Sequence, residues 1–413
     1  MSKQIKTILI PNATGPTNIG DQAMLEVLVK LLYESYPQAK LILHSSDVAL
    51  YKKVPSYVLK NALYHEVAFA DTRFISRLRK LVTLFWYLMK IAVFNTPPIK
   101  KDLDTSLSGI VSDYFKADMI VFVGGGYLRS QTGLTQIINA TMQLVHLLLA
   151  QKSKAITIVA PISFGPYAQG WLEALSAQVL LRCDLVSLRE EFSYNKLKDR
   201  KSKSVILSSD HALLLDKASS QKKGTFRIGV TLRQWLSPKK QKDFENNVYS
   251  AIKKFARTHS IEVLPIVQVH GEKYGTQDKS ICLKLREKLL ANGIRVLPIK
   301  TVTTVSEGKK IYSSLDMLLG MRMHSNIIAA TQGIPFVAIS YEYKTEGIAT
   351  QLGLKDYVIK IEDVTSTRLE KLLEKGYSNR TTIKSKMNSN LQLIQTEQKR
   401  LWTTIFKQFK TVI

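Results

Sequence analysis

Three arginines stand at points where strand-like stretches of the sequence end. They are Arg189 in SLRE, Arg233 in GVTLRQW and Arg322 in GMRMHS. A guanidinium group donates parallel hydrogen bonds that match the oxygens of a carboxylate or a phosphate. Each arginine alone is more typical of a surface charge or a structural ion pair than of a ligand site. Three of them at corresponding places favour a site for a small anionic ligand.

His324 lies two residues after Arg322, just before the expected start of a helix. An imidazole titrates near neutral pH, which makes this residue the best candidate for a general acid or base. The other six histidines, among them His44, His65 and His146, have no comparable setting. A lone histidine is more often structural, but the neighbouring arginine favours a catalytic role here.

Two glycine-containing loops also follow strand-like stretches. The first, GPTNIGD over residues 15–21, precedes a helix, and the second is the triplet at residues 124–126. Glycines let a backbone approach a ligand closely, and a helix start offers free N–H groups to an anion. Asn18 or Asp21 would also serve as a plain helix cap, and the triplet as a plain tight turn. The G-x-G-x-x-G fingerprint of dinucleotide binding is absent.

The elements that must position these residues alternate between strand-like and helix-like segments. Strands are expected in KTILI, KLILHS, KADMIVFV, KAITIVAPISFG, CDLVSLRE and KSVILSS, and later in FRIGVTLR, IEVLPIVQV, IRVLPI and PFVAISY. Such alternation predicts an α/β fold of parallel sheets covered by helices on both faces. Ligands bind such sheets beyond the carboxyl ends of the strands, where the arginines, His324 and the glycine loops all fall.

Length predicts two domains, because a single core stops growing well below 413 residues. The polar stretch DKASSQKKGT, residues 216–225, is the best linker. We therefore expect two Rossmann-like domains facing a cleft, one over residues 1–217 and one over residues 226–413. A Lys-rich helical segment is expected from about residue 365 onward.

The charge is strongly basic, with 59 Lys and Arg against 33 Asp and Glu and a formal net charge of +26. Such an excess attracts anionic partners, although a solvated basic surface explains most of it equally well. The cations are scattered and form no long tail, so no nucleic acid is expected as a partner. Only Cys183 and Cys282 occur, in no C-x-x-C pair, which indicates reduced thiols rather than disulfides or a zinc site.

Residues 74–94, FISRLRKLVTLFWYLMKIAVF, form a mostly apolar stretch that begins among Arg73, Arg77, Arg79 and Lys80. The apolar run is too short to span a bilayer. It is typical of a basic amphipathic helix lying on an anionic membrane surface, or of a helix packed on the protein core. No secretory signal is recognisable at the start. We expect a cytoplasmic protein that is at most peripheral to the inner face of the membrane.

Taken together and in this order, the motifs resemble those of the polysaccharide pyruvyl transferase family. The resemblance spans residues 18–344 and is carried by Asn18, Gly20, Asp21, Gly124, Gly125, Gly126, Arg189, Asp210, Ala212, Arg322, His324, Ser325, Gly333, Pro335, Tyr341 and Lys344. Two departures are Glu190, where the family often has Asp, and the unusual His211. They bear on substrate choice rather than on the reaction class.

The resemblance implies a fold like that of the two-domain GT-B glycosyltransferases, with the acceptor on the N-terminal domain and the donor on the C-terminal domain. It implies transfer of a pyruvyl group from phosphoenolpyruvate to a glycan or lipid-linked oligosaccharide, with no metal and no cofactor. His324 and Arg322 would be catalytic. The substrate would be bound by Arg189, Arg233, Ser325, Lys344, Asn18, Asp21, Gly124, Gly125, Gly126, Asp210 and Tyr341. A nucleotide-sugar glycosyltransferase and a non-catalytic protein that binds a membrane surface or nucleic acid remain alternatives.

Overall fold

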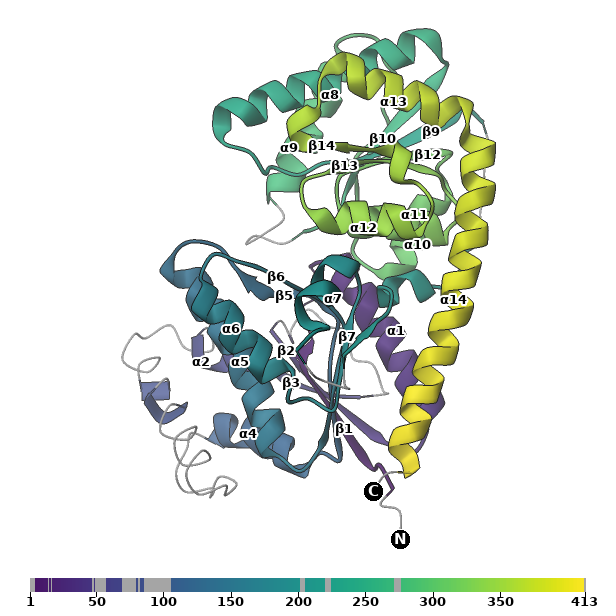
Figure 1. Cartoon of the computed structure of the whole chain (residues 1–413). Coiled ribbons are helices and arrows are strands. Elements are labelled where there is room, and N and C mark those ends of the chain that lie inside the picture. Colours follow the sequence, from purple (N-terminus) through teal and green to yellow (C-terminus); the bar gives the residue numbers. More distant parts are fainter. Residues whose placement is uncertain are drawn as a thin grey trace. The chain divides into compact units, whose positions relative to one another are not determined.

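The computed structural model describes residues 4–13, 15, 17–46, 48, 57–68, 79–80, 82–84, 105–200, 205–219, 224–270 and 276–411. The chain divides into two compact units. Unit 1 comprises Met1–Pro16, Met24–His211 and Arg400–Ile413, and unit 2 comprises Thr17–Ala23 and Ala212–Lys399. Each unit contains its own parallel β-sheet and the helices that pack on it (Figure 1).

The sheet of unit 1 has the strand order β3-β2-β1-β4-β6-β7-β8, and β5 pairs with β6. All of its described pairings are parallel, as the alternation of strands and helices in the sequence predicts. The strands are β1 (Thr7–Ala13), β2 (Lys40–Ser45), β3 (Val58–Asn61), β4 (Met119–Phe122), β5 (Gly125–Ser130), β6 (Ile156–Tyr167), β7 (Leu185–Leu188) and β8 (Val205–Leu207). The helices are α1 (Ile19–Ser35), α2 (Leu63–Ala68), α4 (Thr105–Lys116), α5 (Leu134–Lys152), α6 (Gly170–Leu180) and α7 (Glu191–Leu197).

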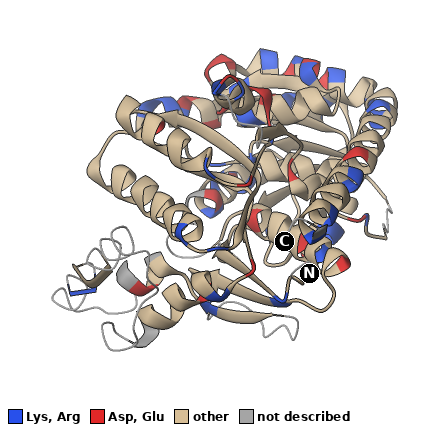
Figure 2. Ribbon diagram, turned by 60° about the horizontal axis from the view of Figure 1, so that its bottom comes forward, with Lys and Arg blue, Asp and Glu red and all other residues tan. Residues whose placement is uncertain are grey.

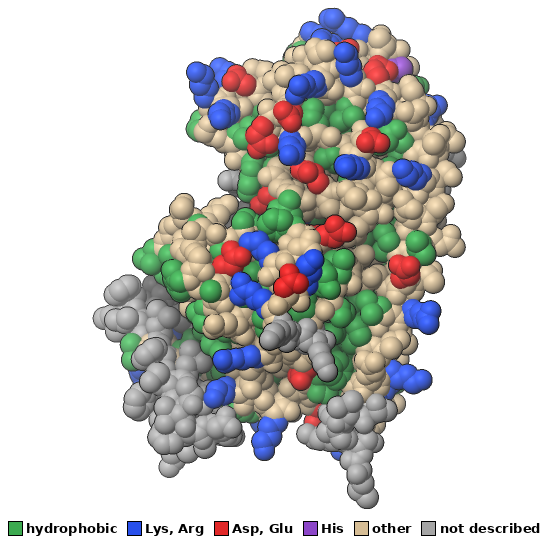
Figure 3. All heavy atoms as spheres, viewed as in Figure 1, with side chains coloured by type: hydrophobic (Ala, Val, Ile, Leu, Met, Phe, Trp, Pro, Cys, Tyr) green, Lys and Arg blue, Asp and Glu red, His purple; other side chains and the backbone are tan. Residues whose placement is uncertain are grey.

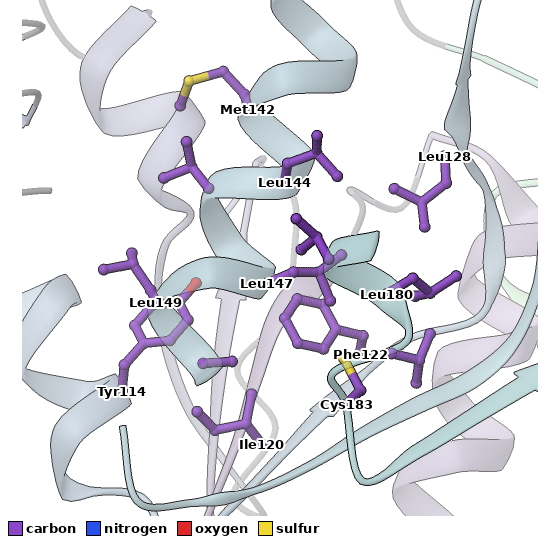
Figure 4. Close-up of a cluster of buried hydrophobic side chains, with 14 of the residues drawn as sticks. Tyr114, Ile120, Phe122, Leu128, Met142, Leu144, Leu147, Leu149, Leu180 and Cys183 are labelled. Atoms are coloured by element: carbon purple, nitrogen blue, oxygen red, sulfur yellow. The ribbon is translucent and has the colours of Figure 1, made fainter. Parts of the chain in front are cut away.

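The core of unit 1 forms where α4, α5 and α6 cover one face of this sheet. Ile120 and Phe122 of β4 meet Leu147 of α5 and Leu180 of α6, and all four side chains are buried (Figure 4). Cys183 belongs to the same cluster as a free thiol, and burial raises its pKa to about 12. It is therefore a small apolar core residue, as its isolated position in the sequence indicates.

The sheet of unit 2 has the order β11-β10-β9-β12-β13-β14 and is also parallel. Its strands are β9 (Phe226–Thr231), β10 (Ile261–Val267), β11 (Lys300–Thr301), β12 (Met317–Gly320), β13 (Phe336–Ser340) and β14 (Val358–Lys360). Its helices are η2 (His211–Leu214), α8 (Pro238–Thr258), α9 (Thr276–Leu290), α10 (Val305–Ser313), α11 (Met323–Thr331), α12 (Tyr343–Gln351), η3 (Lys355–Tyr357), η4 (Ile361–Asp363) and α13 (Ser366–Ser378). The central strands β9, β12 and β13 are apolar and buried, as expected for strands covered on both faces.

Besides η2, whose first residue His211 belongs to unit 1, two longer helices have residues in both units. Helix α1 begins in unit 2 and continues in unit 1, and the long helix α14 (Arg380–Thr411) begins in unit 2 and ends in unit 1 (Figure 1). The end of α14 is anchored in unit 1, where the Tyr36 hydroxyl donates a 2.6 Å hydrogen bond to the Phe406 carbonyl. The units therefore differ from the predicted domain ranges at both ends, since residues 17–23 belong to unit 2 and residues 400–413 to unit 1.

The stretch proposed as a basic amphipathic helix, residues 74–94, lies outside the described residues except for residues 79–80 and 82–84, which are helical. There the Lys80 ammonium forms a 2.9 Å ion pair with Glu66, and the side chains of both residues are largely buried. Among the described residues, no helix has the length and apolarity needed to span a membrane. Elsewhere Lys and Arg are spread over helices of both units, interspersed with acidic residues (Figures 2 and 3).

Candidate functional site

Side chains that can bind an anion or transfer a proton lie at the carboxyl edge of the unit 2 sheet. The strands β10, β9, β12 and β13 are neighbours in this sheet and parallel, so the segments that follow them meet at one edge. Arg233 follows β9, Arg322 and His324 follow β12, and Tyr341 follows β13. Arg233 and Tyr341 are 108 positions apart in the sequence, and the parallel topology brings these segments to one edge.

Arg322 is held by a carboxylate that the sequence analysis did not single out. Its Nε donates to Asp278 Oδ2 at 3.0 Å and its Nη2 to Asp278 Oδ1 at 2.5 Å. Asp278 is fully buried near the start of α9, whereas the Arg322 side chain keeps 15% of its surface exposed. Burial pulls the pKa of Arg322 down, but the hydrogen bonds and charge of Asp278 more than offset this and leave the pKa above its usual value. The guanidinium is thus fixed in orientation, with Nη1 outside this fork.

Arg233 lies beside Arg322 and is held by aromatic rings instead. Its guanidinium carbon is 4.8 Å from the ring centroid of Trp235 and 4.9 Å from that of Tyr341, so both contacts are cation–π interactions. In the described part of the chain its buried Nε has no hydrogen-bond partner. Its Nη1 donates to the Tyr341 hydroxyl at 3.1 Å, and Tyr341 also lies close enough to Arg322 to raise the pKa of that guanidinium. Tyr341 is therefore near both guanidinium groups.

His324 lies in the first turn of α11, and the start of α1 packs directly on it. A Cβ added to Gly20 would lie 2.1 Å from Nδ1, 2.2 Å from Cγ and 2.6 Å from Cβ of His324. Only a glycine fits there, because real Cβ atoms do not approach other heavy atoms so closely. The glycine loop at residues 15–21 thus contacts the R-x-H-S motif, about 300 residues away in the chain.

Asn18 and Asp21 organise the start of α1. Asn18 Oδ1 accepts a 3.1 Å hydrogen bond from the backbone N–H of Gly20, and Asn18 Nδ2 donates to Asp21 Oδ2 at 2.9 Å. This is the arrangement of a helix cap. In the described contacts, both residues, which the sequence analysis proposed for substrate binding, hold the backbone that faces His324.

Ser325 lies beneath the site rather than at its surface. Its side chain is fully buried, and its hydroxyl lies 2.8 Å from that of Thr231 and donates to the Arg322 carbonyl at 2.5 Å. It therefore holds the loop that carries Arg322 and His324. Lys344, in the first turn of α12, is also largely buried, and its ammonium lies 3.9 Å from Glu342.

Arg189 and Asp210, both proposed to bind substrate, form a buried ion pair inside unit 1. The Arg189 Nη1 donates to Asp210 Oδ2 at 2.6 Å and its Nε to the Ser163 hydroxyl at 2.8 Å, while Glu190 lies 3.7 Å away. Only 3% of Arg189 is exposed. Glu190 itself hydrogen-bonds to Ser163 at 3.1 Å. This arginine is occupied by protein carboxylates, so Arg233 is the one that the structure places beside Arg322.

The glycine triplet has a packing role in unit 1. A Cβ at Gly124 would lie 2.4 Å from the carbonyl oxygen of Pro161 in β6, and Gly125, at φ +145°, begins β5. The chain continues as a strand here instead of the tight turn that the sequence suggests. These contacts account for Gly124 and Gly125, and nothing in them yet indicates a ligand.

Neither Asp278 nor Trp235 was predicted from the sequence to belong to the site. Asp278 stands in TQDKSICLKL, where an acidic residue at a helix start is ordinary, and only the fold places it against Arg322. Trp235, two residues after Arg233, offered a weak signal of stacking. Within the described ranges, no three His, Cys, Asp or Glu side chains are grouped so as to hold a metal ion, and the expected absence of a metal stays a prediction.

Residues 18–343 match the family model of the polysaccharide pyruvyl transferases. The chain belongs to this family. The chain is similar in sequence to the amylovoran biosynthesis protein AmsJ of Erwinia amylovora. The two are 21% identical over 267 residues. That match covers 60% of this chain and 62% of AmsJ, so the chain spans less than two thirds of that relative's length.

The solved structures similar to this pyruvyl transferase family member share its fold at low identity. The UDP-GlcNAc 2-epimerase of Neisseria meningitidis, bound to UDP-GlcNAc, has a TM-score of 0.56 at 12% identity and covers 98% of this chain and 99% of its own. A protein of Listeria monocytogenes, titled as a UDP-N-acetylglucosamine 2-epimerase, has a TM-score of 0.56 at 11% identity. The match covers 94% of this chain and 91% of that chain. The trehalose-6-phosphate synthase OtsA has a TM-score of 0.54 at 12% identity, and the match covers 99% of each chain. These proteins have two Rossmann-like domains of the GT-B type, which confirms the predicted fold class.

Proposed function

We propose that this chain transfers a pyruvyl group from phosphoenolpyruvate to two hydroxyls of one sugar, in a polysaccharide or its lipid-linked precursor, forming a cyclic ketal. The observation that carries the proposal is the pair Arg233 and Arg322, both near Tyr341 at the edge where His324 lies. The family match supports the reaction class, and the amylovoran role printed for AmsJ supports a polysaccharide acceptor.

Phosphoenolpyruvate suits this pair because it carries a phosphate and a carboxylate close together. Arg322 presents Nη1 while Asp278 holds its other edge, and Arg233 forms no ion pair in the described part of the chain. Two fixed guanidinium groups therefore face one ligand with two anionic groups, and their charge is neutralised only in part by Asp278. Preorganised donors of this kind bind without reorganising at the moment of reaction.

The chemistry proceeds in two additions at the same carbon. A proton is added to the methylene carbon of the donor, and one sugar hydroxyl bonds to the central carbon and loses its proton. The second hydroxyl then attacks this carbon and loses its proton, the C–O bond to phosphate breaks, and inorganic phosphate leaves with both electrons of that bond. His324 moves a proton in this sequence, and the arginines stabilise the departing phosphate. No metal or cofactor is needed for these steps.

A nucleotide-sugar glycosyltransferase is the second candidate. It is favoured by the fold, since the similar structures include an epimerase bound to UDP-GlcNAc and one titled as a complex of TcCGT1 with UDP. The likeness lies near 12% identity and concerns the fold alone. A clamp of two arginines with a histidine suits a small dianion at least as well as a nucleotide diphosphate.

The test is incubation of the purified chain with phosphoenolpyruvate and a panel of glycans and lipid-linked oligosaccharides. We expect release of inorganic phosphate and an acceptor heavier by the mass of pyruvate less one water. The same panel with UDP-sugars is the comparison. Acceptor modification from a UDP-sugar, with phosphoenolpyruvate left intact, would establish the glycosyltransferase instead.

A further inference from the structure

The contact between Gly20 and His324 leaves no room for adjustment by the histidine side chain. Rotation about χ1 moves the imidazole ring but not the His324 Cβ, which would lie 2.6 Å from a methyl group at position 20. Relief therefore requires the backbone of α1 or of α11 to shift. The two helix starts are packed as closely as a glycine allows.

The segment 17–23 is also tied to unit 2 independently of this contact. Asn18 forms an antiparallel bridge with Val269, and the His270 N–H donates a 2.9 Å hydrogen bond to the Thr17 carbonyl just beyond the end of β10. Ile19 is completely buried. Backbone pairing on one side and side-chain burial on the other fix the position of Gly20.

We propose that Gly20 is a positioning residue for His324, and that the segment 17–23 forms one wall of the site built by unit 2. The Gly20 backbone covers the Nδ1 side of the imidazole and thereby limits the ring to one orientation. This inference rests on the proposed function in so far as His324 acts on the substrate. The placement of the ring itself does not depend on which donor is used.

The experiment compares Gly20→Ala with Gly109→Ala, a helical glycine of α4 where an added Cβ meets no atom within 4 Å. With phosphoenolpyruvate and a productive acceptor, Gly20→Ala should lower kcat about 10- to 100-fold and change the KM for phosphoenolpyruvate less than about threefold, because a misplaced acid or base lowers the rate of chemistry. Gly109→Ala should match the wild type. A wild-type kcat for a folded Gly20→Ala would overturn the proposal.

A second comparison separates positioning from a general loss of stability. In a His324→Gly background the methyl group at position 20 has no ring to displace, so Gly20→Ala should cause no further loss of melting temperature. An equal loss of melting temperature in both backgrounds would show that the glycine serves the fold alone and would overturn the inference.

A third readout remains available if phosphoenolpyruvate proves not to be the donor. The His324 ring resonances, assigned by their loss in His324→Gly, should move in Gly20→Ala and stay in place in Gly109→Ala. Unmoved resonances in Gly20→Ala would reject the positioning role whatever the reaction is. Moved resonances without phosphate release would reject the proposed donor and keep the positioning role.

Discussion

Arg189 and Arg322 share a residue type and a place after a strand, yet their surroundings differ. Arg189 is 3% exposed and paired with Asp210 in unit 1, so its charge is neutralised by a protein carboxylate. Arg322 is held by Asp278 along one edge and remains partly open along the other. Replacing one member of a buried ion pair typically leaves an uncompensated charge. Substitution of Arg189 should therefore affect mainly stability, and substitution of Arg322 should also affect binding at the proposed site.

His324→Ala should abolish turnover and leave the fold intact. A general acid or base contributes on the order of 100- to 10,000-fold to the rate, and the imidazole is not a large core side chain. Phosphate release measures the activity, and circular dichroism measures the fold. Near-normal turnover in a folded variant would exclude His324 as the acid or base.

Arg322→Lys should raise the KM for phosphoenolpyruvate about tenfold, since lysine keeps the charge but cannot reproduce the fork with Asp278. The matched control is Arg368→Lys, which alters an exposed pair whose atoms are 3.3 Å apart. The control should change neither KM nor stability appreciably, because exposed ion pairs contribute about 0–1 kcal/mol. Equal donor dependence in both variants would remove Arg322 from the donor site.

At the scale of elements, the short helix η2 and the end of α14 meet through His211 and Trp402 in unit 1. Their ring centroids are 4.7 Å apart in an edge-to-face contact, and both side chains are buried. Neither His211 ring nitrogen has a hydrogen-bond partner among the described residues. Burial lowers the pKa of His211 to about 4, although the charge of Asp210 opposes this. The unusual histidine at this position thus belongs to a core contact.

This contact predicts an acid sensitivity of known sign. The unfolded chain binds a proton at His211 below about pH 6.5 and the folded chain only near pH 4, so stability falls as the pH drops through this window. The loss amounts to on the order of 3 kcal/mol. His211→Phe should reduce the slope of melting temperature between pH 6.5 and 4. It should not abolish the slope, because burial also lowers the pKa of His146 to about 3.

His259→Gln is the comparison for this measurement, because the His259 ring is partly exposed and lies 2.8 Å from Glu374. A melting curve of His211→Phe that falls with acid as steeply as the wild type would contradict the assignment.

At the scale of the whole molecule, the net charge of +26 is spread over both units and mixed with acidic residues (Figure 2). Such a distribution favours weak long-range attraction to anionic surfaces over a single docking patch. Lys80, expected among the cations of the amphipathic stretch, is paired with Glu66 and largely buried. Its charge is therefore not free to meet lipid, which leaves Arg73, Arg77 and Arg79 of that stretch for the proposal.

Binding to liposomes containing anionic lipid should fall sharply when Arg73, Arg77 and Arg79 become Gln, since each cation near such a surface contributes about 1 kcal/mol. A triple variant of Lys239, Lys240 and Lys242 to Gln, on α8, removes the same charge elsewhere and should bind nearly as well as the wild type. Co-sedimentation at low salt measures the difference. If the wild type does not bind these liposomes, the membrane proposal fails.

The α/β class, the parallel sheets and the strand-end positions of Arg233, Arg322 and His324 could be predicted from the sequence. This is possible because apolar strand runs alternate with amphipathic helices, and because residues that follow parallel strands share one edge. The order of the motifs also determined the family, which the match over residues 18–343 confirms. These properties are local or follow from order along the chain.

Which of the candidate residues lie near one another depends on the tertiary structure. Arg189 and Arg233 look alike in sequence, and burial against Asp210 or stacking on Trp235 distinguishes them. Likewise the proximity of Gly20 to His324 depends on a segment near the start of the chain that packs in unit 2. Contacts between residues about 300 positions apart depend on packing, which no local pattern encodes. The physical reason is that burial and ion pairing determine whether a charged group can still bind a ligand. Both are properties of the folded chain.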